Sequence, residues 1–160
     1  MAGLGTIIEG KNAVLSVLES GRATKISYIQ QENKSENFDT ILNLAKKNKV
    51  DVTVVGSKEE WPYHPRHSIV ALCKPKKTFK EKDLEKFKHK NFIVCDHIQD
   101  TNNIGAIARS AAAFNFEVIA IPLKRSVKIT ERTFSIASGG LEKVEIIFYN
   151  SIFSLSLIHI

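Results

Sequence analysis

The sequence has few cysteines and no long apolar run. Only Cys73 and Cys95 are cysteines, and both lie within apolar stretches. This placement favours buried, reduced thiols of a cytosolic protein. No apolar run approaches the ~20 residues that a membrane-spanning helix needs. Residues 1–6 also lack the basic start and apolar stretch of a signal peptide. We therefore expect a cytoplasmic protein with no membrane partner.

Several common ligand-binding patterns are absent as well. A zinc site made of His64, His67, Cys73 and Cys95 is an alternative, but no Cys-x-x-Cys pair supports it, so we expect no metal. Gly-x-Gly-x-x-Gly does not follow the apolar residues 92–95, and the P-loop pattern does not occur. A Rossmann-type nucleotide-binding enzyme is therefore a weaker alternative, which a cofactor-binding screen would test.

Positive charge exceeds negative charge. The 23 Lys and Arg residues against 17 Asp and Glu residues give a net charge of +6 and a pI near 9.3. This balance fits a polyanionic partner such as nucleic acid, although a solvated, lysine-rich surface produces the same count. Residues 74–90 are crowded with lysine, which favours a solvated connector over a binding site.

The most informative stretch runs from Asp96 to Pro122. The apolar residues 92–95 before it predict a buried strand, and residues 117–121 predict a second strand. A helical face is predicted by apolar residues at i, i+3, i+4 and i+7, namely Ile104, Ile107, Ala108 and Ala111. We expect Asn102 or Asn103 to cap this helix and Asn115 to end it. Ligands of such βαβ units bind outside the carboxyl ends of the strands, which places residues 96–103 at a site.

The rest of the sequence alternates between helical and extended patterns. Before residue 91 we expect helices within 7–19 and 38–47, and strands at 26–29, 50–55 and 68–73. After Pro122 we expect a helix at 129–137 and a strand at 144–149. This alternation predicts an α/β protein. Its expected parts are a small domain at 1–76, a linker at 77–90 that is partly helical around Leu84 and Phe87, and a second domain at 91–160.

Two groups of residues carry a resemblance to a known family. Asp100-Thr101-Asn102-Asn103-Ile104-Gly105-Ala106, followed by Arg109-Ser110-Ala111, resembles the first motif of the SpoU (TrmH-type) RNA ribose 2′-O-methyltransferases of the SPOUT superfamily. Ser138-Gly139-Gly140-Leu141-Glu142 and then Asn150 resemble the second motif. Thr101 replaces the usual proline, which loosens the loop because proline fixes its own φ. Residues 7 to about 75 resemble the L30e-like substrate-binding domain of many members.

The resemblance implies methyl transfer from S-adenosylmethionine to a ribose 2′-hydroxyl of RNA by a homodimer. Ribosomal RNA is the favoured substrate and transfer RNA the second. By resemblance, Asn103 orients the site, Arg109 contacts RNA and helps to activate the hydroxyl, and Glu142 holds the arrangement. Because arginine keeps its proton up to a pKa above ~12, we expect Arg109 to act mainly through charge and hydrogen bonds. Taken singly, Asn103 is better explained as a helix cap, Arg109 as part of a surface salt bridge and Glu142 as a solvated carboxylate. Their joint occurrence at the spacings of the family favours function.

Two basic loops supply the expected RNA contacts. Residues 61–67 place aromatic side chains beside basic ones, a combination that suits unpaired bases and phosphates. A proline-stiffened loop in which Trp61 packs on its own domain is an equal alternative. Arg66-His67-Ser68 stands where the family commonly has His-Gln-Gly. The expected RNA-binding residues are Trp61, Tyr63, His64, Arg66, His67, Lys124 and Arg125.

The sequence departs from the family after Asn150. The family continues with a charged amphipathic helix and two later motifs, which form the trefoil knot that holds S-adenosylmethionine. Here residues 151–160 contain no Asp, Glu, Lys or Arg and lean toward a strand. We expect an incomplete knot, through truncation or a frame shift, and assign no cofactor-binding residues. A catalytically inactive RNA-binding fragment is the alternative function, and binding of S-adenosylmethionine distinguishes the two.

Overall fold

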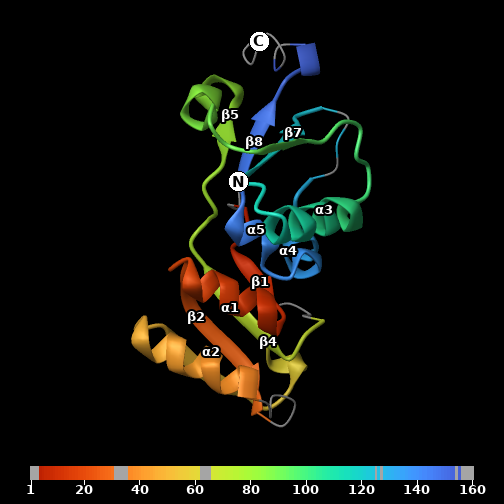
Figure 1. The fold of residues 1–160 in the computed structure, drawn as a ribbon. Helices are drawn as coiled ribbons and strands as arrows, with labels where there is room; N and C mark the ends of the chain where they lie inside the picture. Colours follow the sequence, from red (N-terminus) through yellow and green to blue (C-terminus); the bar gives the residue numbers. More distant parts are fainter. Residues whose placement is uncertain are drawn as a thin grey trace. The chain divides into compact units, whose positions relative to one another are not determined.

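The chain folds into two compact units. The computed structural model describes residues 4–30, 36–61, 66–124, 126, 128–153 and 155. The units span Met1–Lys76 and Lys77–Ile160 (Figure 1). Each unit contains one four-stranded sheet with helices packed on it. The predicted α/β class is therefore confirmed.

The first unit has a mixed sheet. Its elements are β1 (Ile7–Glu9), α1 (Lys11–Glu19), β2 (Ala23–Ile29), α2 (Glu36–Lys47), β3 (Asp51–Val55), the short 3₁₀ helix η2 (Lys58–Glu60) and β4 (Ile69–Cys73). The strand order is β1-β4-β2-β3. Strands β2 and β3 are parallel, whereas β4 is antiparallel to both β1 and β2. The three-residue β1 was not predicted, because so short a segment carries no recognisable alternation.

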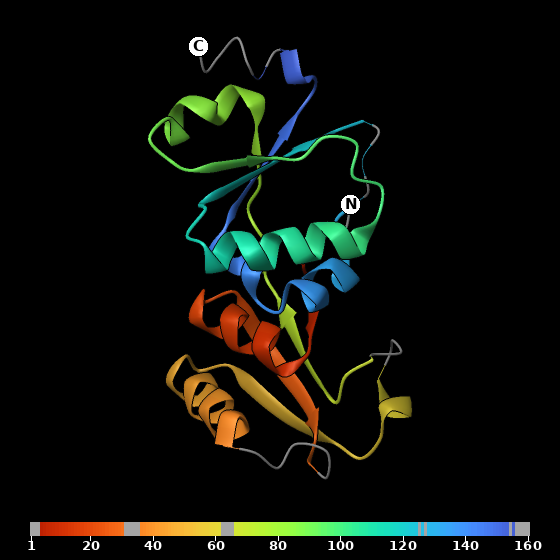
Figure 2. The same cartoon turned by 45° about the vertical axis from the view of Figure 1, so that its right-hand side comes forward.

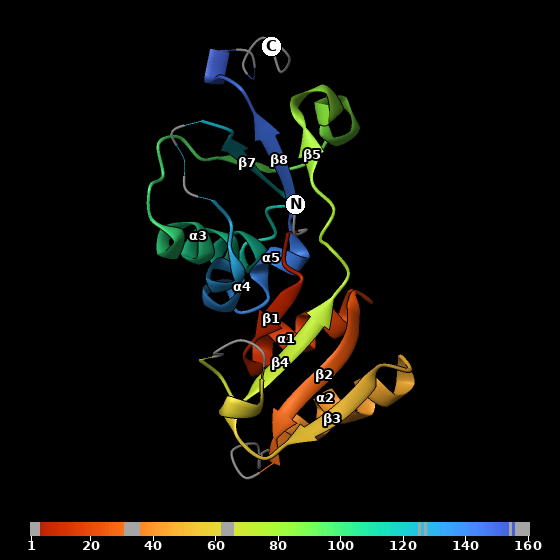
Figure 3. The same ribbon diagram turned by 180° about the vertical axis from the view of Figure 1, so that it is seen from behind.

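Both helices of this unit cover the same face of the sheet. They lie in front of the strands in Figure 1 and behind them in Figure 3. Helix α1 buries the predicted apolar stripe of Ala13, Val14, Val17 and Leu18. Helix α2 buries Phe38, whose ring packs edge-on against the Tyr28 ring, with 4.6 Å between the two ring centroids. These contacts form the core of the unit, because a helix stabilises a sheet mainly by burying its apolar stripe against it.

The second unit has an all-parallel sheet. Its elements are β5 (Phe79–Lys80), the 3₁₀ helix η3 (Glu81–Phe87), β6 (Phe92–Val94), α3 (Thr101–Ala113), β7 (Val118–Pro122), α4 (Glu131–Ala137), α5 (Gly140–Lys143) and β8 (Glu145–Tyr149). The strand order is β5-β8-β7-β6. Strand β7 is buried along its whole length. This is typical of a central parallel strand, which is covered on both faces.

The register of the parallel strands places their carboxyl ends at one edge of the sheet. Val94 lies opposite Ala120, Pro122 opposite Tyr149, and Lys80 opposite Phe148. Figure 2 shows α3 and α4 on one side of the sheet and η3 on the other. Helix η3 contributes Leu84 and Phe87 to a core that includes Tyr149. The loops that follow β6, β7 and β8 therefore leave the sheet at the same edge. The helices packed on its two faces hold the sheet in place.

The segment 77–90 is part of this unit, so the expected solvated linker is wrong. Strand β5 pairs with β8, and Leu84 and Phe87 are buried, at 0% and 9% exposure. The rings of Phe79 and Phe87 also pack edge-on, with 4.8 Å between their centroids. Burial of these apolar side chains outweighs the preference of the surrounding lysines for water, since the lysines keep their charged ends at the surface.

The tail also differs from the expected strand where it is described. Ile152, Phe153 and Leu155 are helical, and the Leu155 N–H donates to the Ser151 carbonyl at 3.2 Å. This turn buries Leu155 in the core formed by Leu84, Phe87 and Tyr149. Burial of this side chain outweighs the β propensity of the segment. Residues 154 and 156–160 lie outside the described residues. Within the described part of the chain, no helix has the length and apolar character to cross a membrane.

Candidate functional site

The N-cap of helix α3 lies two residues before the earlier of the two predicted cap positions. The cap is Asp100, not Asn102 or Asn103. Its carboxylate accepts from the Asn102 backbone N–H at 2.9 Å and from Asn102 Nδ2 at 3.2 Å. These hydrogen bonds lower the pKa of Asp100 below its usual value. Asp100 takes the cap because the helix starts at Thr101, the position where the family usually has proline. Asn115, at φ 58°, follows the end of the helix as predicted.

The first two predicted catalytic residues lie on the exposed side of α3. The buried face consists of Ile104, Gly105, Ala108 and Ala111, so Asn103 and Arg109 point away from the core. Neither side chain makes a hydrogen bond or ion pair with another residue in the described ranges. Six residues of helix separate them by roughly 9 Å along the axis and about 120° around it. Helix α3 alone therefore does not bring the two groups to one point.

Glu142, the third predicted catalytic residue, lies on α5, which packs against α3. A Cβ at Gly140 would stand only 2.6 Å from the Ala108 carbonyl oxygen and 2.7 Å from the Arg109 Cα. The absence of a side chain at Gly140 therefore allows the backbone of α5 to touch α3 at Arg109. The half-buried Glu142 is two residues further along α5. The tertiary structure thus joins the two sequence motifs at Arg109.

Gly105 has a corresponding role on the same buried face of α3, where it meets α4. A Cβ there would lie 2.7 Å from Ile136 Cγ2 and 3.0 Å from the Thr133 carbonyl oxygen, both in α4. Gly139, at φ 92°, makes the turn between α4 and α5, a conformation that glycine adopts without strain. The motif glycines consequently explain how α3, α4 and α5 pack closely against one another.

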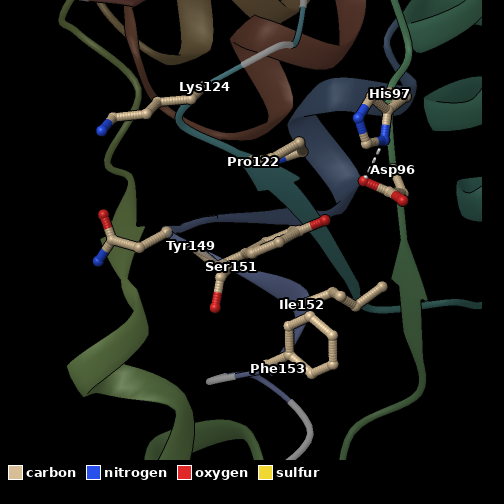
Figure 4. Close-up of a pocket in the computed structure, with 9 residues that line it drawn as sticks. Asp96, His97, Pro122, Lys124, Tyr149, Ser151, Ile152 and Phe153 are labelled. Carbon is tan, nitrogen blue, oxygen red and sulfur yellow. Dashed lines mark ion pairs between the residues drawn. The ribbon is translucent and has the colours of Figure 1, made fainter.

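A cleft of about 330 Å³ lies at the carboxyl ends of the parallel strands. Its lining follows β6, β7 and β8 and is made of Asp96, His97, Pro122, Lys124, Tyr149, Asn150, Ser151, Ile152 and Phe153. Figure 4 shows Asp96 and His97 on one side and Lys124 on the other, with the Tyr149 ring between them. Among the residues predicted for the site, Lys124 lines this cleft, whereas Asn103, Arg109 and Glu142 do not.

The wall formed after β6 is held by two polar contacts. The Tyr149 hydroxyl donates to the Cys95 carbonyl at 2.7 Å, within the core. His97 has a left-handed φ of 52°, and its Nδ1 lies 2.8 Å from Asp96 Oδ1. Both of these side chains are at least half exposed, so their pairing contributes little to stability. Sequence reasoning missed Tyr149, although its position at the carboxyl end of a strand was a usable signal.

In the first unit, the structure separates Trp61 from the basic residues that follow it. Trp61 is 7% exposed and packs against Ile29, Val55 and Val70, which favours the packing alternative over base stacking. The expected exposed stacking platform is therefore wrong, because a buried indole cannot receive a base. Arg66 and His67 are exposed, and their backbone N–H groups donate to Glu9 Oε2 at 2.7 and 3.4 Å. Tyr63, His64 and Arg125 lie outside the described residues.

The two cysteines are buried. Burial raises the pKa of the Cys95 thiol to about 11, so this thiol stays protonated at neutral pH. Of the residues proposed for the alternative zinc site, His64 lies outside the described ranges. Within those ranges, no three His, Cys, Asp or Glu side chains are placed to hold a metal ion.

Replacing Asp100 should destabilise the second unit in a pH-dependent manner. Because the folded-state pKa of Asp100 is lowered, its charge stabilises the fold above the unfolded pKa of about 3.9. This contribution is lost as pH falls through the lower folded value. We expect Asp100→Ala to unfold at less urea than wild type at pH 7, with the gap narrowing below about pH 4. Asp100→Asn keeps a cap acceptor and should lose less; equal losses at pH 7 would contradict the capping role.

Gly140→Ala tests the packing of α5 on α3. The added methyl group would meet backbone atoms of Ala108 and Arg109, which cannot move independently of their helix. Overpacking of this kind costs about 1–3 kcal/mol, measurable by urea unfolding. Gly56→Ala is the matched control, because its Cβ would meet only the movable carboxylate of Glu60. A loss at Gly140 no greater than at Gly56 would show that α5 does not depend on this approach.

Comparisons with known proteins cover both units. Residues 90–155 match the SpoU rRNA Methylase family, and residues 7–79 match the family described as RNA 2′-O ribose methyltransferase substrate binding. A protein of Staphylococcus epidermidis assigned to the TrmH family of tRNA/rRNA methyltransferases is 30% identical over 148 residues, covering 88% of this chain. A Staphylococcus aureus protein of the same assignment is 30% identical over 149 residues, covering 89%. The chain spans 59% and 60% of the length of these relatives.

Solved structures share the fold. The SpoU methyltransferase AviRb from Streptomyces viridochromogenes superposes with a TM-score of 0.72 at 15% identity, covering 98% of this chain and 58% of that one. An rRNA methyltransferase from Sinorhizobium meliloti, solved with AdoMet, gives a TM-score of 0.67 at 14% identity over 96% of this chain and 58% of that one. With both motifs joined at α3, the two family matches and this shared fold, the chain belongs to the SpoU (TrmH-type) family of RNA methyltransferases.

Proposed function

We propose that this chain serves in the transfer of a methyl group from S-adenosylmethionine to a ribose 2′-hydroxyl of RNA, within a homodimer. Ribosomal RNA is the favoured substrate and transfer RNA the second. The observation that carries the proposal is the contact of α5 with α3 at Gly140, which brings the Glu142 segment to Arg109. The descriptions of the two matched families, one naming rRNA and the other a 2′-O ribose methyltransferase, support the same reaction.

Arg109 is suited to holding the RNA in place. Arg109 is exposed and its side chain makes no hydrogen bond or ion pair with the other described residues, so its guanidinium is available to a phosphate or a ribose oxygen. A guanidinium donates several hydrogen bonds and stays charged at neutral pH. It can therefore lower the energy of the negative charge that develops on the attacking oxygen. Positioning and charge of this kind supply much of the rate in a reaction between a weak nucleophile and a strong methyl donor.

The residues of the cleft fit a nucleoside-like cofactor. S-adenosylmethionine supplies an activated methyl group when it is bound. A volume of about 330 Å³ lies within the range of small-molecule sites. Phe153, which is 79% exposed, would contact its base, while Asp96 and Asn150 would accept from its hydroxyl or amino groups. AviRb and the Sinorhizobium enzyme have both been solved with AdoMet, which supports the same cofactor for this chain.

The first unit is proposed to bind RNA outside the catalytic site. Arg66 and His67 are exposed, and hydrogen bonds to Glu9 hold their backbone, so a ligand would meet two cationic or polar side chains that project from a fixed backbone. The net charge of +6 favours a polyanion. The family match of residues 7–79 supports this division of labour between the units.

Arg109→Ala should lower methyl transfer by roughly 10²-fold while leaving the fold intact, because the side chain lies off the buried face of α3. The measurement is transfer of labelled methyl groups from S-adenosylmethionine to ribosomal RNA. Nuclease digestion and mass spectrometry would then show whether the product is a 2′-O-methyl nucleoside.

Lys143→Ala is the control for the loss of one positive charge. Lys143 is exposed on α5, next to Glu142, so its removal changes the net charge equally without touching α3. We expect near wild-type transfer from this variant. Undiminished transfer by Arg109→Ala would remove Arg109 from the mechanism, and a base-methylated product would exclude the ribose reaction.

RNA binding should depend steeply on salt. Counterion release predicts that log K falls with log salt by about 0.7–0.9 per contacted phosphate. Arg66→Ala should reduce this slope by about one contact, as measured by fluorescence anisotropy of labelled ribosomal RNA fragments. Lys46→Ala, which removes an exposed charge from α2, should leave the slope nearly unchanged. No binding of the wild-type chain at low salt would reject RNA as its partner.

A further inference from the structure

Glu81 holds the residue that follows β8 at the edge of the cleft. Its Oε2 atom accepts from the Asn150 backbone N–H and from Asn150 Nδ2, both at 3.1 Å. Asn150 lines the cleft and lies within the SpoU methylase match. Glu81 lies in the ten residues, 80–89, between the two family matches, so neither match assigns it a role.

The position of Glu81 follows from strand pairing. Because β5 and β8 run parallel, with Lys80 opposite Phe148, the residues that follow the two strands emerge at the same edge of the sheet. Glu81 begins η3, where the Lys80 N–H donates to Asp83 Oδ2 at 3.1 Å. Leu84 and Phe87 then anchor η3 in the core beside Tyr149. The Glu81 backbone is thus fixed from both ends, and its half-buried side chain reaches Asn150 from a rigid support.

The chemistry of the contact fixes the orientation of the Asn150 amide. A carboxylate only accepts hydrogen bonds, so the amide must turn its NH₂ group toward Glu81. The carbonyl oxygen Oδ1, on the other branch of the amide, is then left for a ligand. Without Glu81 the amide is free to rotate by 180° and offer a donor instead. Glu81 therefore determines whether the cleft presents an acceptor or a donor at this point.

We propose that Glu81 is a positioning residue of the methyltransferase site, which orients Asn150 so that its Oδ1 accepts from a hydroxyl or amino group of the bound ligand. This inference rests on the function proposed above. It assigns part of the site to the segment between the two family matches.

The test uses NMR spectroscopy of the 160-residue chain with S-adenosylmethionine as the probe. In Glu81→Ala, the backbone and Nδ2 resonances of Asn150 should both shift, because each loses its acceptor. Glu81→Gln keeps an acceptor of the same shape and should shift them less. Glu85→Ala is the matched control: it removes an exposed carboxylate from the same helix, one that pairs with Lys88 rather than with Asn150. Unfolding in urea identifies any variant that fails to fold, and Glu81→Gln then carries the test.

Binding follows from the same titrations. We expect Glu81→Ala to raise the Kd about tenfold, as for loss of a hydrogen bond to a charged group, with Glu81→Gln restoring most of the affinity. In an Asn150→Ala background, Glu81→Ala should have no further effect, since Glu81 acts through Asn150.

Unshifted Asn150 resonances in Glu81→Ala, or additive losses in the double variant, would overturn the inference. If the wild-type chain shows no response to S-adenosylmethionine while Asn150 still shifts in Glu81→Ala, the proposed cofactor is wrong and the positioning by Glu81 stands.

Discussion

The parallel register of β5, β8, β7 and β6 is the constraint on which the second unit depends. Parallel strands end at a common edge, so residues distant in sequence meet there. Asp96 after β6, Lys124 after β7 and Asn150 after β8 line one cleft for this reason. A shift of register by one residue would turn every side chain of a strand to the other face. Because β7 is buried on both faces, such a shift would not expose its side chains but would exchange those that pack on one face of the sheet with those that pack on the other.

Close helix packing is the second requirement of the site. At Gly105 and Gly140, neighbouring helices approach α3 to distances that leave no room for a Cβ. The exposed polar residues of α3 and α5 can lie near one another only because the small residues beneath them allow this approach. The motif therefore combines glycines that set the spacing of the helices with polar side chains at the surface of α3. A glycine in such a motif is better explained by what it packs against than by flexibility.

In the first unit, burial separates Trp61, which packs in the interior, from Arg66 and His67, which lie at the surface. Trp61 stabilises the open face of the sheet, while Arg66 and His67 stay at the surface with their backbone fixed by Glu9. An aromatic residue beside basic ones was equally consistent with a stacking platform, since composition does not record which side of a loop faces the core. The burial of Trp61 decides the matter, because a side chain that is 7% exposed within an apolar cluster is closed to a base.

The sequence by itself determined the longer elements, the buried stripe of α1, the αL residue Asn115 and the motifs that identify the family. These depend on local periodicity and on chain conformations that a few neighbouring residues dictate.

Only the tertiary structure decided the conformation of segments that are too short to show a helical or strand periodicity. Strands β1 and β5 exist because partners distant in sequence pair with them, and the segment 77–90 joins the second unit because Leu84 and Phe87 find a core there. The Asp100 cap and the Glu81–Asn150 contact likewise depend on where a helix starts and where a strand ends. Such positions follow from packing across the whole unit, which no local window of sequence contains.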